Sequence, residues 1–550
     1  MTENGSPIGS NESDVSRRSY MQLLGAVGLG AGTHAASGGS DVAAAAPDGD
    51  GTANGITVSD SGIDVGDGIT RLDFEGSLSP AVQDDSNSVQ IQSASNRNVV
   101  NVRVDLGVRP RQDDLWAAIQ RHYNSFSPAN RNHLYVVPAE TWFVRSNNLD
   151  LPDHQFFGLV GEPSATLRVN DRNVDRLMTV GRINTSAGRA RQTVMRDLNI
   201  DISGDYDAGI GRWYTYGYGR IENIVMRGKR DRLHPDYGGD LHTLLVNGVQ
   251  PETSNLIRQC LFPDGHVIYD PDVAERGYAI GFSSEPPNQG TNIWDGCQIT
   301  GYGSGFYVST SGGRNVIRGS HVRNCGRASI RIGDNDHLQD CTVTMTEHPG
   351  RPWTALWLES GDRQVVDNVL IRNEIEKDTE IVRLTQDGRA RLSDVNIVDN
   401  GGSGRAMRID DNDQTQTVFE GLTLVDRSSP TGWSDYAVYV RSSNVTFRDC
   451  DFDLESQSDT SRHGIYVTGG NVDRLSLDNC DVDPDGASLR FGGSGEEHNV
   501  TNSFFEGSVT SDSGTTLSNV LWVGNRHAGQ TNFRGQRSNW QGDFNFGFNV

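Results

Sequence analysis

The sequence NVTFRDCDF (residues 444–452) returns as RLSLDNCDV (residues 474–482), with a cysteine in the same place. Aligning the chain on this cysteine position, here called the slot, gives twelve copies spaced mostly 21 to 30 residues apart. The slot is filled by Leu198, Ile224, Cys260, Cys297, Ser320, Cys341, Val369, Val395, Leu422, Cys450, Cys480 and Ser503. A period of this length is typical of a solenoid, in which each repeat forms one coil.

Each copy carries apolar residues three positions before the slot and two positions after it. Strand alternation keeps both residues inside only if the chain turns a corner between them. The residue just before the slot is Asp, Asn, Gly or Gln in every copy, and most of these types tolerate left-handed backbone angles. A third short strand precedes the pair, as in GFYV at 305, ALWL at 355 and AVYV at 437. Three stacked strands per coil predict an all-β fold, a right-handed parallel β-helix.

The six cysteines have two explanations. Five of them fill the slot, where valine, leucine and serine stand in other copies, which favours reduced thiols in the core. An exported protein could instead form disulfides, and a bridge between Cys450 and Cys480 is the alternative. No close CxxC pair suggests zinc.

The segment ahead of the coils contains DDLWAAIQRHYNSF (113–126), HLYVVPAETWFV (133–144) and GLVGEPSATL (158–167). This order resembles the start of pectate-lyase-like right-handed β-helix proteins, with an N-terminal capping helix followed by the first strands of the stack. The resemblance covers residues 105–525 and implies that fold. It does not imply one activity, since the superfamily includes lyases, hydrolases, epimerases, phage tailspikes and adhesins.

The third strand of each coil predicts an outward column of side chains. The residue between its two inward apolar positions is, coil by coil, Gly281, Tyr307, Arg331, Trp357, Arg383, Arg408, Tyr439, Tyr466 and Arg490. Aromatic rings stack on sugars, and guanidinium groups grip carboxylate or sulfate. We therefore predict that Arg331, Trp357, Arg383, Arg408, Tyr307 and Tyr439 bind an acidic polysaccharide. The alternative is that they are ordinary exposed sheet residues.

Long loops follow the slot strand at residues 227–240, 263–277, 344–354, 425–436 and 453–463, and they predict a wall beside this column. The first loop, RGKRDRLHPDYGGDLH, is the richest in polar side chains and contains Lys229, one of only two lysines in the chain. In the lyases that the fold resembles, an arginine or lysine removes the proton beside a uronate carboxylate. The resemblance implies Lys229 or Arg230 as the base and His234 or Tyr237 as the proton donor.

Calcium is the candidate cofactor, because it neutralises the uronate carboxylate in such lyases. Asp270 and Asp272 have a spacing that suits oxygen ligands of calcium. A glycoside hydrolase would need two carboxyl groups across the scissile bond, and the polygalacturonase pattern of paired aspartates followed by Gly-His-Gly is not present intact.

The ends and the composition predict export. Twin arginines, Arg17 and Arg18, precede a short glycine-rich apolar run, so residues 1–46 are expected to form a Tat-type signal peptide and linker. The run is too short for stable membrane insertion. With 72 acidic and 48 basic residues the net charge is −24, which is typical of a halophile surface and argues against nucleic-acid binding. Residues 55–104 are expected to form additional β structure, and residues 526–550 a C-terminal cap or tail.

Together these features predict a secreted or cell-surface protein. The expected activity is that of a lyase that cleaves a uronate-containing polysaccharide by β-elimination. The alternatives are a glycan-binding β-helix without catalysis and a glycoside hydrolase of the same fold.

Overall fold

The structure is a computed structural model, and the chain divides into two compact units, Met1–Ser93 and Ala94–Val550. It describes four strands of the first unit and, in the second, residues 97–183, 189–204, 207–231, 241–267, 279–309, 312–347, 354–359, 361–375, 380–385, 388–401, 404–410, 416–428, 435–456 and 461–543. The predicted signal peptide lies outside the described residues.

The first unit contains a small antiparallel sheet with the strand order β1-β2-β4-β3. Its strands are β1 (Ile56–Ser59), β2 (Gly62–Val65), β3 (Ser79–Val82) and β4 (Val89–Gln92). They lie within the predicted N-terminal β segment.

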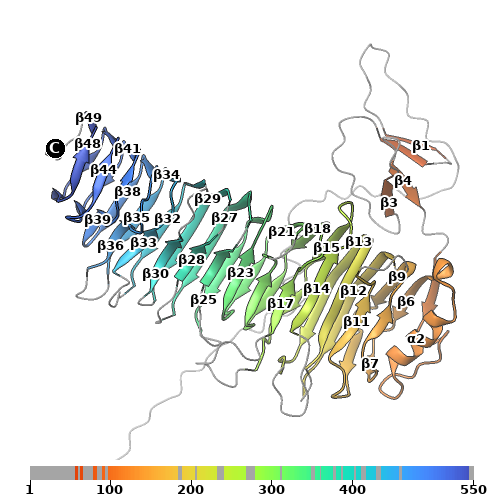
Figure 1. Cartoon of the computed structure of the whole chain (residues 1–550). Helices are drawn as coiled ribbons and strands as arrows, with labels where there is room; N and C mark the ends of the chain where they lie inside the picture. The colour runs from red at the N-terminus through yellow and green to blue at the C-terminus, as the bar shows by residue number, and fades with distance from the viewer. Residues whose placement is uncertain are drawn as a thin grey trace, which may run out of the picture. The chain divides into compact units, whose positions relative to one another are not determined.

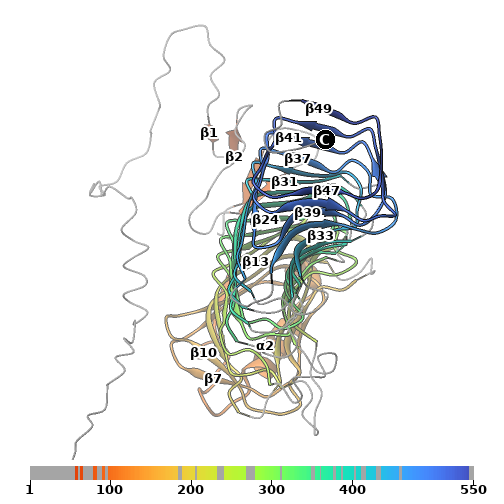
Figure 2. The ribbon, with the colours of Figure 1, turned by 90° about the vertical axis from the view of Figure 1, so that its left-hand side faces the viewer.

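The second unit is a parallel β-helix, as predicted, and its coils stack along one axis in Figure 1. Each coil contributes a strand to three parallel sheets, and Figure 2 shows two of them as opposite sides, with β33, β39 and β47 on one and β24, β31 and β37 on the other. We call the three the ladder sheet, the corner sheet and the slot sheet. The strands β12, β27 and β29 each run through two sheets, and the long strand β13 runs through all three, so that these strands link the sheets at the corners.

The ladder sheet consists of β8 (Leu149–Leu151), β11 (Arg176–Val180), the start of β13 (Gly209–Arg227), β14 (His242–Gly248), β17 (Ile280–Ser283), β20 (Ser304–Tyr307), β23 (Ala328–Ile332), β26 (Thr354–Leu358), β28 (Glu380–Leu384), β30 (Arg405–Ile409), β33 (Tyr436–Val440), β36 (His463–Val467), β39 (Ala487–Phe491), β43 (Ser508–Ser511) and β47 (Thr531–Phe533). The corner sheet consists of β5 (Asn98–Asn101), β6 (Asn132–Val137), β9 (His154–Gly161), β12 (Ala190–Asp201), β13, β15 (Ser254–Arg258), β18 (Thr291–Asp295), β21 (Arg314–Arg318), β24 (His337–Gln339), β27 (Gln364–Asn373), β29 (Ala390–Asp399), β31 (Thr417–Glu420), β34 (Val445–Arg448), β37 (Ser476–Asp478), β41 (Asn499–Thr501), β45 (Leu521–Val523) and β49 (Gln541–Asp543). The slot sheet consists of β7 (Thr141–Val144), β10 (Thr166–Val169), the ends of β12, β13, β27 and β29, β16 (Leu261–Phe262), β19 (Gln298–Thr300), β22 (His321–Arg323), β25 (Thr342–Met345), β32 (Thr423–Asp426), β35 (Asp451–Leu454), β38 (Asp481–Pro484), β42 (Phe504–Phe505) and β46 (Arg526–His527). Short strands β40 (Gly495–Glu496), β44 (Thr516–Ser518) and β48 (Gln536–Ser538) form a further three-stranded sheet.

All twelve predicted corner residues have a positive φ, between 50° and 67°. They are Asp197, Asn223, Gln259, Gly296, Gly319, Asp340, Asn368, Asp394, Gly421, Asp449, Asn479 and Asn502. This left-handed residue turns the chain between the corner and slot sheets, so that the apolar residues on both sides of it point inward.

The core fills the inside of the coils with stacked apolar side chains. Among them all six cysteines are buried and free, so the prediction of reduced core thiols is confirmed. Burial raises the pKa of Cys325 and of Cys341 to about 12, which makes these thiols unreactive.

The predicted capping helix is α2 (Leu115–Asn124), followed by the 3-10 turn η2 (Pro128–Asn130). Asp114 caps α2 by accepting a hydrogen bond from the backbone N–H of Trp116. The Trp116 ring is buried, and its Nε1 donates to the carbonyl of Leu177 at 2.6 Å, which ties the helix to the first coils. Figure 1 shows α2 beside these coils.

Two predicted boundaries differ from the structure. The stack begins with β5, which pairs with β6, so the boundary predicted at residue 105 falls inside the second unit. The stack also continues beyond residue 525, because β46 and β49 pair in register with the preceding coil. Residues 526–543 are therefore part of a coil and not a separate tail. Within the described residues, no helix is long and apolar enough to cross a membrane.

Candidate functional site

The predicted outward column lies on one sheet, with each residue paired to the next in the neighbouring coil. The ladder column is Ser283, Tyr307, Arg331, Trp357, Arg383, Arg408, Tyr439, Tyr466 and Arg490. The first position was predicted as Gly281, but the register places Ser283 there. A Cβ on Gly281 would lie 1.7 Å from a methyl group of Ile299, so this position faces the core.

Arg331 lies between two aromatic rings. Its guanidinium carbon is 4.4 Å from the ring centroid of Tyr307 and 4.2 Å from that of Trp357. The next coil places the guanidinium of Arg383 4.9 Å from the same Trp357 ring. The column is therefore stacked along the helix axis, and the rings turn their edges toward solvent. The Arg331 side chain is only 5% exposed and is ion-paired with Glu359, so it is less accessible than an ordinary outward sheet residue.

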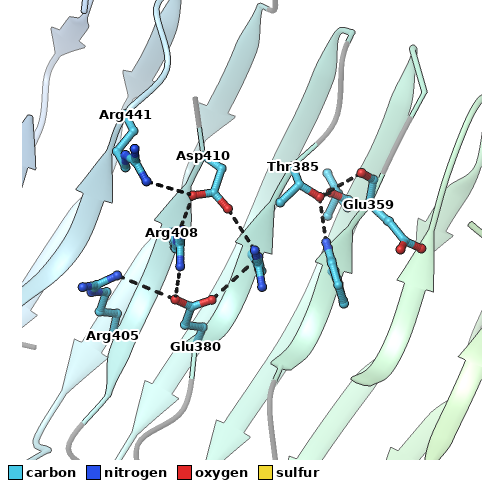
Figure 3. Close-up of polar contacts among 10 residues, drawn as sticks. Glu359, Glu380, Thr385, Arg405, Arg408, Asp410 and Arg441 are labelled. Atoms are coloured by element: carbon cyan, nitrogen blue, oxygen red, sulfur yellow. Dashed lines mark hydrogen bonds and ion pairs between the residues drawn. The ribbon is translucent and has the colours of Figure 1, made fainter. Parts of the chain in front are cut away.

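Glu380 and Asp410 form a closed ring of ion pairs with two ladder arginines (Figure 3). Arg408 donates to Glu380 at 2.8 Å and to Asp410 at 2.5 Å. Arg383 donates to Asp410 at 3.2 Å, and its Nε lies 3.7 Å from Glu380. Burial alone would lower the pKa of Arg408, but its hydrogen bond and charge interaction with Glu380 hold it above the usual value. The four ion pairs fix both arginines in place.

Two further arginines flank this ring (Figure 3). Arg405 lies 3.7 Å from Glu380, and Arg441 lies 3.9 Å from Asp410. Arg405 also covers the Tyr439 ring at 3.8 Å, and Tyr439 is only 9% exposed.

The C-terminal end of the column is rich in aromatic side chains. Tyr436 stacks on Tyr466 with ring centroids 4.8 Å apart, and Tyr439 meets the Tyr466 ring edge-on. Arg490 lies over Tyr466 and forms an ion pair with Asp512 at 2.8 Å.

The N-terminal end of the column is buried and does not reach solvent. The Ser283 hydroxyl lies 2.9 Å from Nδ1 of His242, whose Nε2 is 3.4 Å from Glu285. A serine, a histidine and a carboxylate in this order resemble a catalytic arrangement, but Ser283 is completely buried and also bonds to the Leu244 carbonyl. The accessible column therefore starts at Tyr307.

The predicted catalytic loop belongs to a coil two before that of Tyr307 in chain order, about 10 Å away along the stack. Lys229 is exposed there, as a general base requires. Arg230 is wrong as a base, because its side chain is 0% exposed, ion-paired with Asp207 at 2.5 Å and hydrogen-bonded to Thr243. His234 and Tyr237, and the proposed calcium ligands Asp270 and Asp272, lie outside the described residues. In the part of the chain that is described, no three His, Cys, Asp or Glu side chains are arranged to hold a metal ion.

The sequence analysis missed the carboxylates that complete the site. Glu359 and Asp410 each stand two residues beyond a ladder residue, where strand alternation again points outward. Glu380 and Arg405 begin their strands, three residues before the ladder position. Strand alternation alone could have predicted that Glu359 and Asp410 point outward. Their partners in neighbouring coils could not be predicted in this way, because they depend on the register.

Comparison with known proteins supports the fold. The family model described as "Right handed beta helix region" matches residues 287–407, in agreement with the predicted handedness. A comparison with curated proteins gave no match.

Several solved structures are similar in fold. One is the N-terminal fragment of gene product 12 of bacteriophage phi29, at 15% identity and a TM-score of 0.40, covering 78% of this chain and 72% of that one. Another is a tailspike protein of the E. coli bacteriophage HK620 in complex with a hexasaccharide, at 12% identity and a TM-score of 0.43, covering 84% and 83%. The periplasmic alginate epimerase AlgG is 11% identical with a TM-score of 0.33, covering 80% and 83%. These likenesses concern the fold, and no activity is inferred from them.

Proposed function

We propose that the protein binds a polysaccharide along the ladder sheet, from Tyr307 to Arg490. The observation that supports the proposal is the unbroken column of eight paired residues, whose aromatic and guanidinium groups recur at every coil. Successive coils are about 4.8 Å apart, so the column presents the same kinds of contact at regular intervals. A linear polymer with a repeating unit can use such a surface along its length, whereas a small molecule would use only one or two coils.

The ion pairs make this surface rigid before any ligand arrives. Glu359, Glu380 and Asp410 fix the guanidinium groups, and the Trp357 Nε1 donates to the Thr385 hydroxyl at 2.8 Å. Side chains that are already ordered lose little conformational entropy on binding.

A single substitution tests the location of the binding site. Trp357→Ala removes the ring between Arg331 and Arg383, and we expect it to weaken polysaccharide binding at least about tenfold, as measured by affinity electrophoresis. Phe504→Ala is the matched control, because Phe504 is also half-buried beneath an arginine, Arg526, but lies on the slot sheet. Equal effects of the two substitutions, or none from Trp357→Ala, would place binding elsewhere.

Cleavage by β-elimination stays a prediction. Among the residues proposed for it, Lys229 is the one that the structure describes as exposed. The test is ultraviolet absorbance during incubation with uronate-containing polysaccharides, with and without calcium. A signal from unsaturated uronate that is lost in Lys229→Ala would support a lyase. A flat trace from the folded protein would mean that it binds polysaccharide without cleaving it by β-elimination.

A further inference from the structure

Each arginine of the ladder column is already paired with a carboxylate of the protein. Four arginines stand in the column from Tyr307 to Arg490, and each pairs with a carboxylate. Arg331 pairs with Glu359, Arg383 and Arg408 share Glu380 and Asp410, and Arg490 pairs with Asp512. Four carboxylates therefore face four guanidinium groups. Each of the four arginines has one pair that bridges to a neighbouring coil, so these pairs belong to the same framework that orders the surface.

An acidic sugar would meet these carboxylates at close range. Its own carboxylate could reach Arg383 or Arg408 only beside Glu380 and Asp410, which already lie 2.5 to 3.7 Å from the same two guanidinium groups. Bringing like charges together, or separating a partly buried pair, opposes binding. A hydroxyl group carries no charge and avoids both costs. It can accept a hydrogen bond from a guanidinium edge and donate one to a carboxylate oxygen.

Two arginines outside the column also pair with Glu380 and Asp410, so four guanidinium groups surround these two carboxylates, and the two added groups lie at the edges of the cluster. Arg405 covers Tyr439 at 3.8 Å and is directed toward Glu380. Arg441 lies at the rim, 41% exposed and 3.9 Å from Asp410.

The aromatic side chains lead to the same conclusion. Guanidinium groups from both neighbouring coils approach the Trp357 ring, so its flat face is occupied. The Tyr307 ring is likewise covered by Arg331 on one side. The column therefore offers edges of rings and guanidinium groups, which favour hydrogen bonding to hydroxyl groups over stacking on sugar rings.

We infer that the ladder sheet selects an uncharged polysaccharide and recognises it through its hydroxyl groups. This rests on the proposed function, and it replaces the acidic substrate predicted from the sequence. An uncharged polysaccharide contains no uronate, so the inference and the lyase prediction exclude each other at this surface.

A binding panel tests the inference. The wild-type protein is compared by affinity electrophoresis on neutral glucans, mannan and xylan and on pectate, alginate, hyaluronan and a sulfated glycan, at low and high KCl. We expect binding to at least one neutral polysaccharide, with an affinity that changes less than twofold with salt. Tighter binding to acidic members, weakened by salt, would overturn the inference and leave the proposed function standing. Binding to none of them by the folded protein would overturn the proposed function itself.

A gain of binding gives a second test. Glu380→Gln with Asp410→Asn removes two negative charges and releases Arg383 and Arg408, so we expect affinity for acidic polysaccharides to rise at least tenfold. The matched control is Asp362→Asn with Glu420→Gln, which makes the same charge change at the exposed pairs with Arg389 and Arg391 away from the ladder sheet. An equal rise in both double variants, or no rise in the folded ladder variant, would contradict the inference.

Discussion

Single buried polar residues tie the inside of neighbouring coils together. A chain of side-chain hydrogen bonds runs through successive coils from Thr215 to Asn255, Asn292 and Asn315, and it ends at Asp336. One Asp336 oxygen accepts the backbone and side-chain N–H groups of Asn315, at 2.8 and 2.9 Å, and the other accepts the Gly333 N–H at 2.7 Å. Burial nevertheless raises the pKa of Asp336 to about 7.

This raised pKa predicts that Asp336 makes stability fall as the pH rises. Its folded-state pKa of about 7 is above the ordinary value of 3.8, so its contribution is complete below pH 3.8 and is lost as the pH rises through 7. The full loss is roughly 4 kcal/mol for a shift of this size. We expect Asp336→Asn, which cannot titrate, to show a smaller fall in Tm between pH 5 and pH 8 than the wild type.

The quantity to compare is the fall in Tm of the variant against that of the wild type. The wild-type fall alone would not isolate Asp336, because Asp399 is also buried with a pKa raised to about 7. Asp362→Asn serves as the control, since a hydrogen bond from Arg389 lowers the pKa of Asp362 and it titrates far below this range. Equal pH slopes for Asp336→Asn and the wild type would show that Asp336 does not titrate between these pH values.

At the scale of the element, the corner decides how strand pairs are joined. Corner side chains of neighbouring coils also bond to one another, as Asn368 does to Asp340 at 2.6 Å and Asn479 to Asp449 at 2.6 Å. Asparagine therefore contributes to the corner in two ways, through its tolerance of a positive φ and through this bond.

Gly296 has a φ of +62° and no side chain, so the need for a positive φ can be tested there without the side-chain hydrogen bond. A Cβ there would find its nearest neighbour 3.8 Å away, at Cγ of Gln259, so space is sufficient. We expect Gly296→Ala to lower the free energy of unfolding by about 1 kcal/mol through backbone strain alone, as measured by denaturant titration.

Gly470→Ala is the control for Gly296→Ala. No atom lies within 4 Å of a Cβ at Gly470, and its φ is outside the left-handed region. This substitution should be neutral or stabilising by up to about 1 kcal/mol. If both glycines responded alike, the corner would not depend on the left-handed angle.

At the scale of the whole molecule, the net charge of −24 acts on all coils at once. Repulsion among surface carboxylates destabilises a folded state, and salt screens it, with a Debye length of about 10 Å at 0.1 M and 3 Å at 1 M. We expect Tm to rise by about 5 °C or more between 0.1 and 2 M KCl. Sucrose stabilises by exclusion without screening, so an equal rise in sucrose would contradict the electrostatic explanation.

The repeat in the sequence determined the solenoid. Inward apolar positions, corner residues and the slot recur in every coil, because every coil must bury the same faces against its neighbours. The three strands per coil, the reduced cysteines and the members of the ladder column from Tyr307 to Arg490 could therefore be predicted from residue types and spacing. The capping helix was implied instead by the resemblance to pectate-lyase-like proteins.

Only the tertiary structure decided which charges remain available at the ladder. Glu380 meets Arg408 from another coil, 28 residues away, and Arg331 meets Glu359 at the same separation. Arg230 stands in a polar stretch of sequence, yet its partner Asp207 holds it inside the protein. A period gives the direction in which each side chain points. It does not give the partner that the side chain finds, because that depends on the register between coils and on the loops that cover them.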